Sequence, residues 1–224
     1  MPPDPSSCDH FGMGDQHQHW QQTYRSHPGI YGSEPSETAV YAGRLFRDRG
    51  VREVLELGAG HGRDSIHLAR QGFHVRATDF SAVALEQLRA DAEHAGLADR
   101  VDAFEHDARH PIPLRYDSVD AVYAHLLLCM NLSTREILDL VGEIRRVLRP
   151  GGVFVYTVRN TEDAQYGTGR AFGDDIYEQD GFAVHFFSRE LVNTLAQGWE
   201  LREVRSCEEG EPPRRLWRVT QSLR

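Results

Sequence analysis

The sequence is poor in cysteine and has no long apolar run. Its 224 residues include three cysteines, Cys8, Cys129 and Cys207, which form no Cys-x-x-Cys pair and no sensible disulfide framework. No run of eighteen apolar residues occurs, so we expect no membrane span. The first seven residues contain neither a basic nor an apolar region, and a secretory signal is not expected. These features predict a cytoplasmic protein with reduced thiols.

The sequence also has fewer basic than acidic residues. The chain has 25 Lys and Arg residues against 34 Asp and Glu residues, which gives a net charge of −9. A nucleic-acid groove needs a basic surface to contact the phosphates. The sequence therefore predicts no nucleic-acid partner.

Histidine, by contrast, is frequent. There are twelve, and the spacing of His17 and His19, with His10 nearby, is compatible with a metal site. The surrounding residues are polar and rich in Pro, Gly and Gln, which is typical of a mobile tail. We therefore predict a disordered tail over residues 1–16 and no metal, with a metal site at these histidines as the open alternative.

Strand-like and helix-like segments alternate along the chain. This alternation predicts an α/β sheet with right-handed crossovers, whose first five strands are parallel and bind ligands beyond their carboxyl ends. A long polar loop is expected over 159–181 and a shorter one over 207–215. The expected strands are 53–57, 74–78, 101–105, 119–123, 153–158, 199–204 and 216–220. The expected helices are 16–24, 36–49, 64–71, 82–95, 134–148 and 189–196.

The range 54–64 is the most informative stretch. An apolar run ends at Glu56, and three glycines then alternate with other residues. Asp79 ends the next expected strand about twenty residues later, which is the spacing of a nucleotide-binding β-α-β unit. A dinucleotide fold needs a third glycine where this chain has Arg63. The pattern therefore favours a nucleoside cofactor without a pyrophosphate.

This Glu-x-Gly-x-Gly-x-Gly run resembles motif I of the class I S-adenosylmethionine-dependent methyltransferases. The segments 105–108, 120–123 and 148–152 are similar, in order and spacing, to later motifs of the same superfamily. Trp20, Tyr24 and the Tyr31-Gly32-x-x-Pro35 segment, with a late Glu-Glu-Gly before basic residues, add a partial likeness to tellurite-resistance and small-molecule methyltransferases. The resemblance implies a Rossmann-like, seven-stranded, mostly parallel sheet of order 3-2-1-4-5-7-6 with helices on both faces. It further implies a methyltransferase domain over 51–224. The aromatic residues Trp20, Tyr24 and Tyr31 before that domain predict a helical lid over 17–50, with ordinary packing of an N-terminal helix as the alternative.

The resemblance also implies the site. The cofactor would be S-adenosylmethionine, with the Asp79 carboxylate on its ribose and a carboxylate near the glycine loop on its cationic amine. The residues expected to bind the cofactor are Tyr24, Tyr31, Glu56, Gly58, Ala59, Gly60, Arg63, Asp64, Asp79, Phe80, Ser81, Asp107, Ala108, Ala124 and His125. Those expected to bind the acceptor are Tyr123, Arg159, Asn160, Tyr166, Arg214, Arg215 and Trp217.

His125 follows the fourth strand and is the candidate general base or positioning residue. A histidine buried beside the cofactor is the alternative. The chain has no Asp/Asn-Pro-Pro-Tyr/Phe motif at this point, which opposes methylation of a DNA base, and its cysteines do not cluster as arsenite methylation would require. We therefore predict methylation of a small, soft or anionic nucleophile.

Three other functions stay open at this point. The first is methylation of a protein or a nucleic acid, and the second is a nicotinamide-dependent oxidoreductase, which Arg63 at the third glycine position opposes. The third is a binding module that senses S-adenosylmethionine without turnover.

Overall fold

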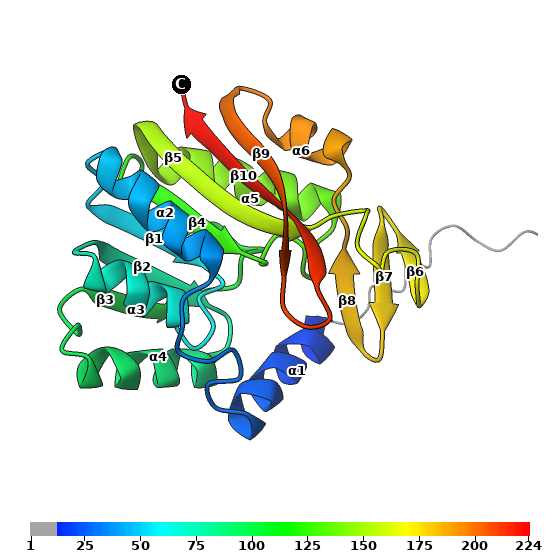
Figure 1. Ribbon diagram of the computed structural model, residues 1–224, viewed down its shortest axis with the longest axis horizontal. Helices are drawn as coiled ribbons and strands as arrows, with labels where there is room; N and C mark the ends of the chain where they lie inside the picture. The colour runs from blue at the N-terminus through cyan, green and yellow to red at the C-terminus, as the bar shows by residue number, and fades with distance from the viewer. Residues whose placement is uncertain (1–12) are drawn as a thin grey trace, which may run out of the picture.

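The computed structural model describes residues 13–224 and is built around one seven-stranded sheet (Figure 1). The strand order is β3-β2-β1-β4-β5-β10-β9, and β10 runs antiparallel to both of its neighbours. The predicted order 3-2-1-4-5-7-6 is confirmed, with β9 and β10 as the sixth and seventh strands. The strands are β1 Glu53–Leu57, β2 His74–Asp79, β3 Val101–Glu105, β4 Val119–His125, β5 Leu148–Arg159, β9 Trp199–Glu209 and β10 Arg214–Leu223.

Helices cover both faces of this sheet because its central strands are apolar on both sides. Successive residues of a strand face opposite ways, so Val54 packs in one core and Leu55 in the other. The first core lies under α2 (Glu37–Asp48), α3 (Arg63–Arg70) and α4 (Ala82–His94). The second lies under α5 (Thr134–Val147) and α6 (Arg189–Leu195). Within residues 13–224, no helix has the length and apolar character that crossing a membrane requires.

The last two strands are longer than predicted. β9 and β10 pair from Trp199 with Leu223 as far as Glu209 with Arg214, where the sequence predicted a loop over 207–215. The prediction was wrong because the tip of this hairpin stays paired beyond Leu216, the outermost residue of β10 that pairs with β5. Its side chains are mostly polar, so the apolar alternation that marks a half-buried strand is missing there.

The segment 159–181 also differs from the prediction of a loop. It contains β6 (Arg170–Gly173) and β7 (Ile176–Gln179), which form a separate three-stranded antiparallel sheet with β8 (Phe182–His185). Asp174 and Asp175 link β6 to β7 with φ angles of 49° and 58°. Aspartate tolerates this left-handed region better than most residues, so the turn forms without a glycine at these two positions.

The N-terminal helix α1 spans Met13–Ser26 and is longer than the predicted 16–24. Residues 1–12 of the predicted tail, with Cys8 and His10, lie outside the described residues. α1 begins within the last four residues of that tail. The described residues contain no cluster of three histidine, cysteine or acidic side chains arranged to hold a metal ion.

The turn between β1 and α3 needs glycine for steric reasons. Gly58, Gly60 and Gly62 have φ angles of 72°, 55° and 91°, in the left-handed region that other residues rarely adopt. A Cβ atom on Gly62 would lie 2.1 Å from Cδ1 of Leu88 in α4. The turn can therefore pack against α4 only without a side chain at this position.

We predict that Gly62→Ala lowers the free energy of unfolding by about 2–4 kcal/mol, because it adds backbone strain to a clash with a buried leucine. Gly142→Ala is the matched control. Gly142 is an exposed residue of α5 with no atom within 4 Å of its Cβ position, so alanine there should stabilise the helix by about 0.5–1 kcal/mol. Urea denaturation of both variants tests the pair, and equal stabilities would contradict it.

Candidate functional site

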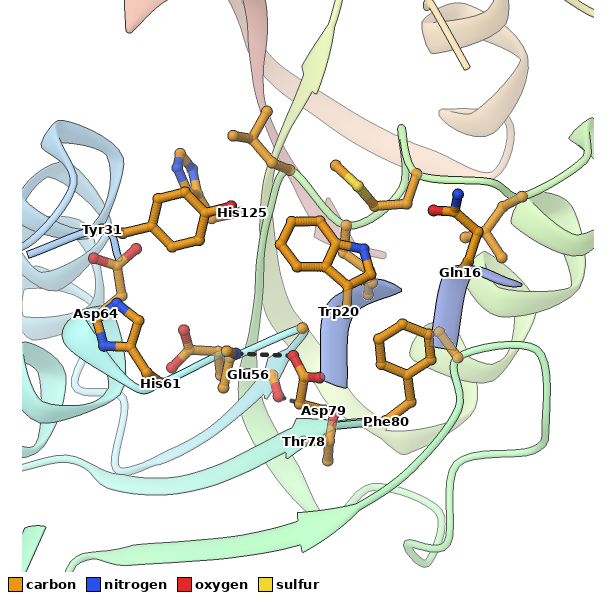
Figure 2. A pocket seen from close by; sticks show the side chains of 18 of the residues that line it. Gln16, Trp20, Tyr31, Glu56, His61, Asp64, Thr78, Asp79, Phe80 and His125 are labelled. Atoms are coloured by element: carbon orange, nitrogen blue, oxygen red, sulfur yellow. Dashed lines mark hydrogen bonds between the residues drawn. The ribbon is translucent and has the colours of Figure 1, made fainter. Parts of the chain in front are cut away.

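A cavity opens at the carboxyl ends of the parallel strands, where Figure 2 shows acidic and aromatic side chains facing one another. α1, β8 and the β9–β10 hairpin also contribute side chains to its walls, so segments far apart in sequence enclose it. Most of the predicted site residues line this cavity. They are Tyr24, Tyr31, Glu56, Gly58, Ala59, Gly60, Arg63, Asp64, Asp79, Phe80, Asp107, Ala108, His125, Arg159 and Arg214.

Asp79 ends β2 at the floor of the cavity. Its two carboxylate oxygens accept hydrogen bonds from the backbone N–H groups of Gly60 and Ser81, both at 2.9 Å. Burial nevertheless raises the pKa of Asp79 to about 6, because the loss of hydration outweighs these donors. The carboxylate therefore gains from any further donor that enters the cavity.

Glu56 and Asp64 lie together under the glycine turn. Asp64 accepts hydrogen bonds from Ser36 N, Ser36 Oγ and Tyr123 Oη, each at 2.8 Å. Glu56 has a single side-chain donor, Ser65 Oγ at 2.5 Å. Burial and the neighbouring Asp64 carboxylate raise the pKa of Glu56 well above its usual range. A cation placed beside Glu56 would relieve both effects.

Helix α1 covers this floor and is attached mainly through polar side chains. Gln21 accepts hydrogen bonds from Ser81 Oγ and Val83 N, at 2.9 and 3.2 Å, where α4 begins. Gln16 donates to Gly181 O at the turn before β8. Tyr24 reaches over the glycine turn so closely that a Cβ atom on Gly60 would lie 2.5 Å from its hydroxyl.

A further carboxylate lines the cavity on the β3 side of Asp79, where His106 N donates to Asp79 O at 3.0 Å. Asp107, which follows β3, accepts a hydrogen bond from Arg109 Nη1 at 3.1 Å. His106 beside it has a buried Nε2 atom without a hydrogen-bond partner among the described residues. Burial lowers the pKa of His106, so the ring stays neutral and presents an unused polar atom on this side of the cavity.

His125 ends β4 and is held at both ring nitrogens. Nδ1 lies 2.8 Å from Thr157 Oγ1, and Nε2 lies 3.2 Å from a carboxylate oxygen of Glu209. Glu209 also accepts a hydrogen bond from Arg63 Nη2 at 3.0 Å. Although burial opposes ionisation, His125 and Arg63 lower the pKa of Glu209 to about 2. Glu209 thus stays ionised at neutral pH and fixes two cavity side chains at once.

Seven predicted site residues lie outside the lining of the cavity. Ser81 and Ala124 are buried beneath it, and Tyr123 donates to Asp64 from below. Trp217 donates to Phe187 O, and Tyr166 donates to Asp175 in the small sheet. The two others are Asn160, which accepts from Glu162 N, and Arg215, which is exposed and lies 3.6 Å from Glu208.

Several lining residues were absent from the predicted cofactor and acceptor sets. Gln16, Trp20 and Phe182 belong to covering segments, although Trp20 was noted for its likeness to small-molecule methyltransferases. Glu209 stood in the late Glu-Glu-Gly segment, but no local pattern ties it to His125, 84 residues away. The remaining ones, His61, Thr78, His106, Arg109, Leu126, Leu127, Met130, Asn131 and Leu132, lie mostly next to predicted residues.

The donor and acceptor set of the cavity fits S-adenosylmethionine. Asp79 has the geometry for hydroxyl donors, and the weakly satisfied Glu56 suits an amine. Gly58 and Gly60 carry no Cβ atoms, and His106 Nε2 is an orphaned polar atom beside the end of β3. No feature of the lining requires a phosphate.

Comparison with known proteins supports the same class. A family model described as a methyltransferase domain matches residues 54–152. The demethylmenaquinone methyltransferase of Clavibacter sepedonicus is 42% identical over 102 residues, which cover 46% of this chain and 39% of that protein. The malonyl-[acyl-carrier protein] O-methyltransferase of Salmonella typhimurium is 34% identical over 117 residues, which cover 50% of this chain and 41% of that protein. The chain thus spans about two fifths of these two relatives.

A solved structure is similar over the entire chain. The 1,6-didemethyltoxoflavin-N1-methyltransferase of Burkholderia thailandensis, crystallised with its acceptor and S-adenosylhomocysteine, superposes with a TM-score of 0.74. The alignment covers 100% of this chain and 93% of that one at 16% identity, so it shows a common fold.

The pKa of Asp79 predicts how cofactor affinity depends on pH. If ribose hydroxyls donate to the ionised carboxylate of Asp79, affinity for S-adenosylhomocysteine should be flat at about pH 7.5 and fall by up to tenfold per unit below about pH 6. The Asp79→Asn variant should bind S-adenosylhomocysteine weakly, and its affinity should not show the decrease that begins near pH 6 in the wild type. Calorimetry at several pH values tests this, and a wild-type affinity that stays level down to about pH 5 would contradict it.

Proposed function

We propose that the chain is a class I S-adenosylmethionine-dependent methyltransferase, in keeping with the methyltransferase-domain model that matches residues 54–152, and that it transfers a methyl group to a small-molecule nucleophile. The observation that carries the proposal is the closure of the cavity. Side chains of α1, of β8 and of the β9–β10 hairpin line it together with the strand ends. A site that is covered from three sides suits a small acceptor that fits entirely inside the cavity better than it suits a segment of a polymer.

Within this proposal, the residues of the chain bind and orient the reactants. S-Adenosylmethionine supplies an electrophilic methyl group on a positively charged sulfur, so the protein must align the nucleophile and exclude water. Asp79 accepts the ribose hydroxyls and Glu56 faces the amine. Tyr24 and Trp20, which stack with ring centroids 5.7 Å apart, close the site over the glycine turn.

His125 is proposed to position the acceptor. Both of its ring nitrogens already have partners, Thr157 and Glu209, so a proton from the acceptor has no free nitrogen to go to in this arrangement. A nucleophile that is already deprotonated, such as a thiolate, needs no base. This favours the soft or anionic acceptor that the sequence analysis predicted.

A macromolecular acceptor is the alternative. One relative is named for an acceptor on an acyl-carrier protein, and the net charge of −9 opposes the nucleic-acid version. The other alternative, a nicotinamide-dependent oxidoreductase, is opposed by Arg63 at the position where a dinucleotide fold needs its third glycine. We also infer that the enzyme works in the cytoplasm, where Cys129 and Cys207, both free in the structure, would stay reduced.

The test of this function is transfer of a radiolabelled methyl group to a panel of thiols, halides, chalcogen oxyanions, phenols and amines. Asp79→Ala should weaken S-adenosylhomocysteine binding by about 1.5–3 kcal/mol, because it removes a charged acceptor from the ribose. At low cofactor concentration, the rate of methyl transfer by this variant should decrease together with its cofactor affinity. Unchanged affinity in a folded Asp79→Ala protein would contradict the cofactor site. Transfer to proteins with none to the panel would favour the alternative.

The segment 20–32 is proposed to act as a lid that tightens over the bound cofactor. Tyr24 of this segment is buried, whereas Tyr31 remains 37% exposed, and the side chain of Gln21 and the carbonyl of Tyr24 make hydrogen bonds to α4. Backbone hydrogen exchange over α1 should slow when S-adenosylhomocysteine is added. Helix α5, on the far side of the sheet, is the internal control and should exchange equally in both states. Equal protection of α1 with and without ligand would contradict the proposed lid, because α1 would then not respond to the cofactor.

A further inference from the structure

Four arginines line the cavity, and three of them already have carboxylate partners. Arg63 pairs with Glu209, and Arg109 pairs with Asp107. Arg159, which the sequence analysis expected to hold an anionic acceptor, is buried. It donates to both carboxylate oxygens of Asp163 and to Gln165. Their positive charges are compensated inside the protein.

Arg214 is the exception. It is half-buried at the start of β10, and within residues 13–224 its side chain has no hydrogen bond or ion pair in the structure. Its direct cross-strand neighbour is Glu209, which instead extends to Arg63 and His125. The guanidinium of Arg214 is therefore an uncompensated charge in the wall of a cavity, a position that favours an anion.

The neighbouring arginine has the opposite orientation. Successive side chains of a strand point to opposite faces, so Arg214 lines the cavity while Arg215 faces away from it. Arg215 is exposed, lies 3.6 Å from Glu208 and donates to Glu162 O. The sequence could not separate the two residues, and the hairpin pairing does.

The cavity that Arg214 lines also has apolar and aromatic walls. Trp20, Phe182 and Met130 line the cavity, and the Trp20 and Phe182 rings meet edge to face with centroids 5.7 Å apart. In Figure 2 the indole of Trp20 stands between Tyr31 and Gln16, across the middle of the cavity. Tyr31 stacks on His61 at an interplanar angle of 10°. Such flat walls favour a ring as ligand.

Building on the proposed function, we infer that the acceptor is a small ring compound that carries an acidic group, which Arg214 binds. The aromatic walls hold the ring, and the charge fixes its orientation relative to His125. This specifies the class of substrate rather than its name. The acidic group that Arg214 holds need not be the atom that receives the methyl group.

The experiment uses matched acid and amide pairs, such as benzoate and benzamide or 4-mercaptobenzoate and 4-mercaptobenzamide. Binding to the full chain loaded with S-adenosylhomocysteine is measured by calorimetry and ligand-observed NMR. The acid of each pair should bind at least tenfold more tightly than the amide. Arg214→Gln should abolish this preference, Arg214→Lys should retain part of it, and Arg215→Gln should retain it in full. S-Adenosylhomocysteine affinity and circular dichroism, measured for every variant, should match those of the wild type.

Three results would overturn the inference. These are an absence of acid-selective binding to the wild type, a preference that survives Arg214→Gln, and a preference that Arg215→Gln removes. Each is distinguishable from failure of the proposed function, because S-adenosylhomocysteine binding and methyl transfer are measured separately. If the protein binds the cofactor and methylates neutral rings as well as acidic ones, the proposed function would stand and the inference about Arg214 would be wrong.

Discussion

The hydrogen bond from Gly60 N–H to Asp79 is the contact on which the rest of the site depends. It joins the turn after β1 to the end of β2, and Gly60 makes this turn with a φ angle of 55°. The same closeness buries the Asp79 carboxylate and raises its pKa to about 6. The chain thus keeps a carboxylate short of donors at the point where a ligand with two hydroxyls would supply them.

Closure of the cavity depends on polar contacts between segments that are distant in sequence. α1 is attached to the start of α4 by the amide of Gln21, and the β9–β10 hairpin is attached to the strand ends through Glu209. Arg63 links three of the walls, since it binds Glu209 and lies 5.8 Å from the centroid of the Tyr31 ring. Polar contacts of this kind exchange with water at little cost. The proposed opening of the covering segments would leave the apolar cores on both faces of the sheet intact.

The charges of the cavity form one connected group with a single exception. Glu56, Asp64 and Asp79 lie near the glycine turn, which suits a cofactor that bears an amine and a sulfonium. Arg63 lies 3.7 Å from Asp64 and 3.0 Å from Glu209, and it joins the acidic residues to the β9–β10 hairpin. Arg214 adds a charge without a partner among residues 13–224, and an acidic acceptor would meet the opposite charge there.

The sequence by itself determined the five parallel strands, the glycine turn and the acids at the strand ends, because these follow from local patterns. An apolar run, a glycine with positive φ and a carboxylate twenty residues later are short-range features, and their resemblance to a superfamily supplied the topology. Only the tertiary structure decided how the site is closed and which charges in it are free. The partner of His125 is Glu209, and the partner of Arg159 is Asp163. The hairpin turns Arg214 inward and Arg215 outward, which depends on where β9 and β10 begin to pair. Pairing between distant segments is set by packing of the whole chain. A shift of one residue in the register would turn Arg214 outward and Arg215 inward.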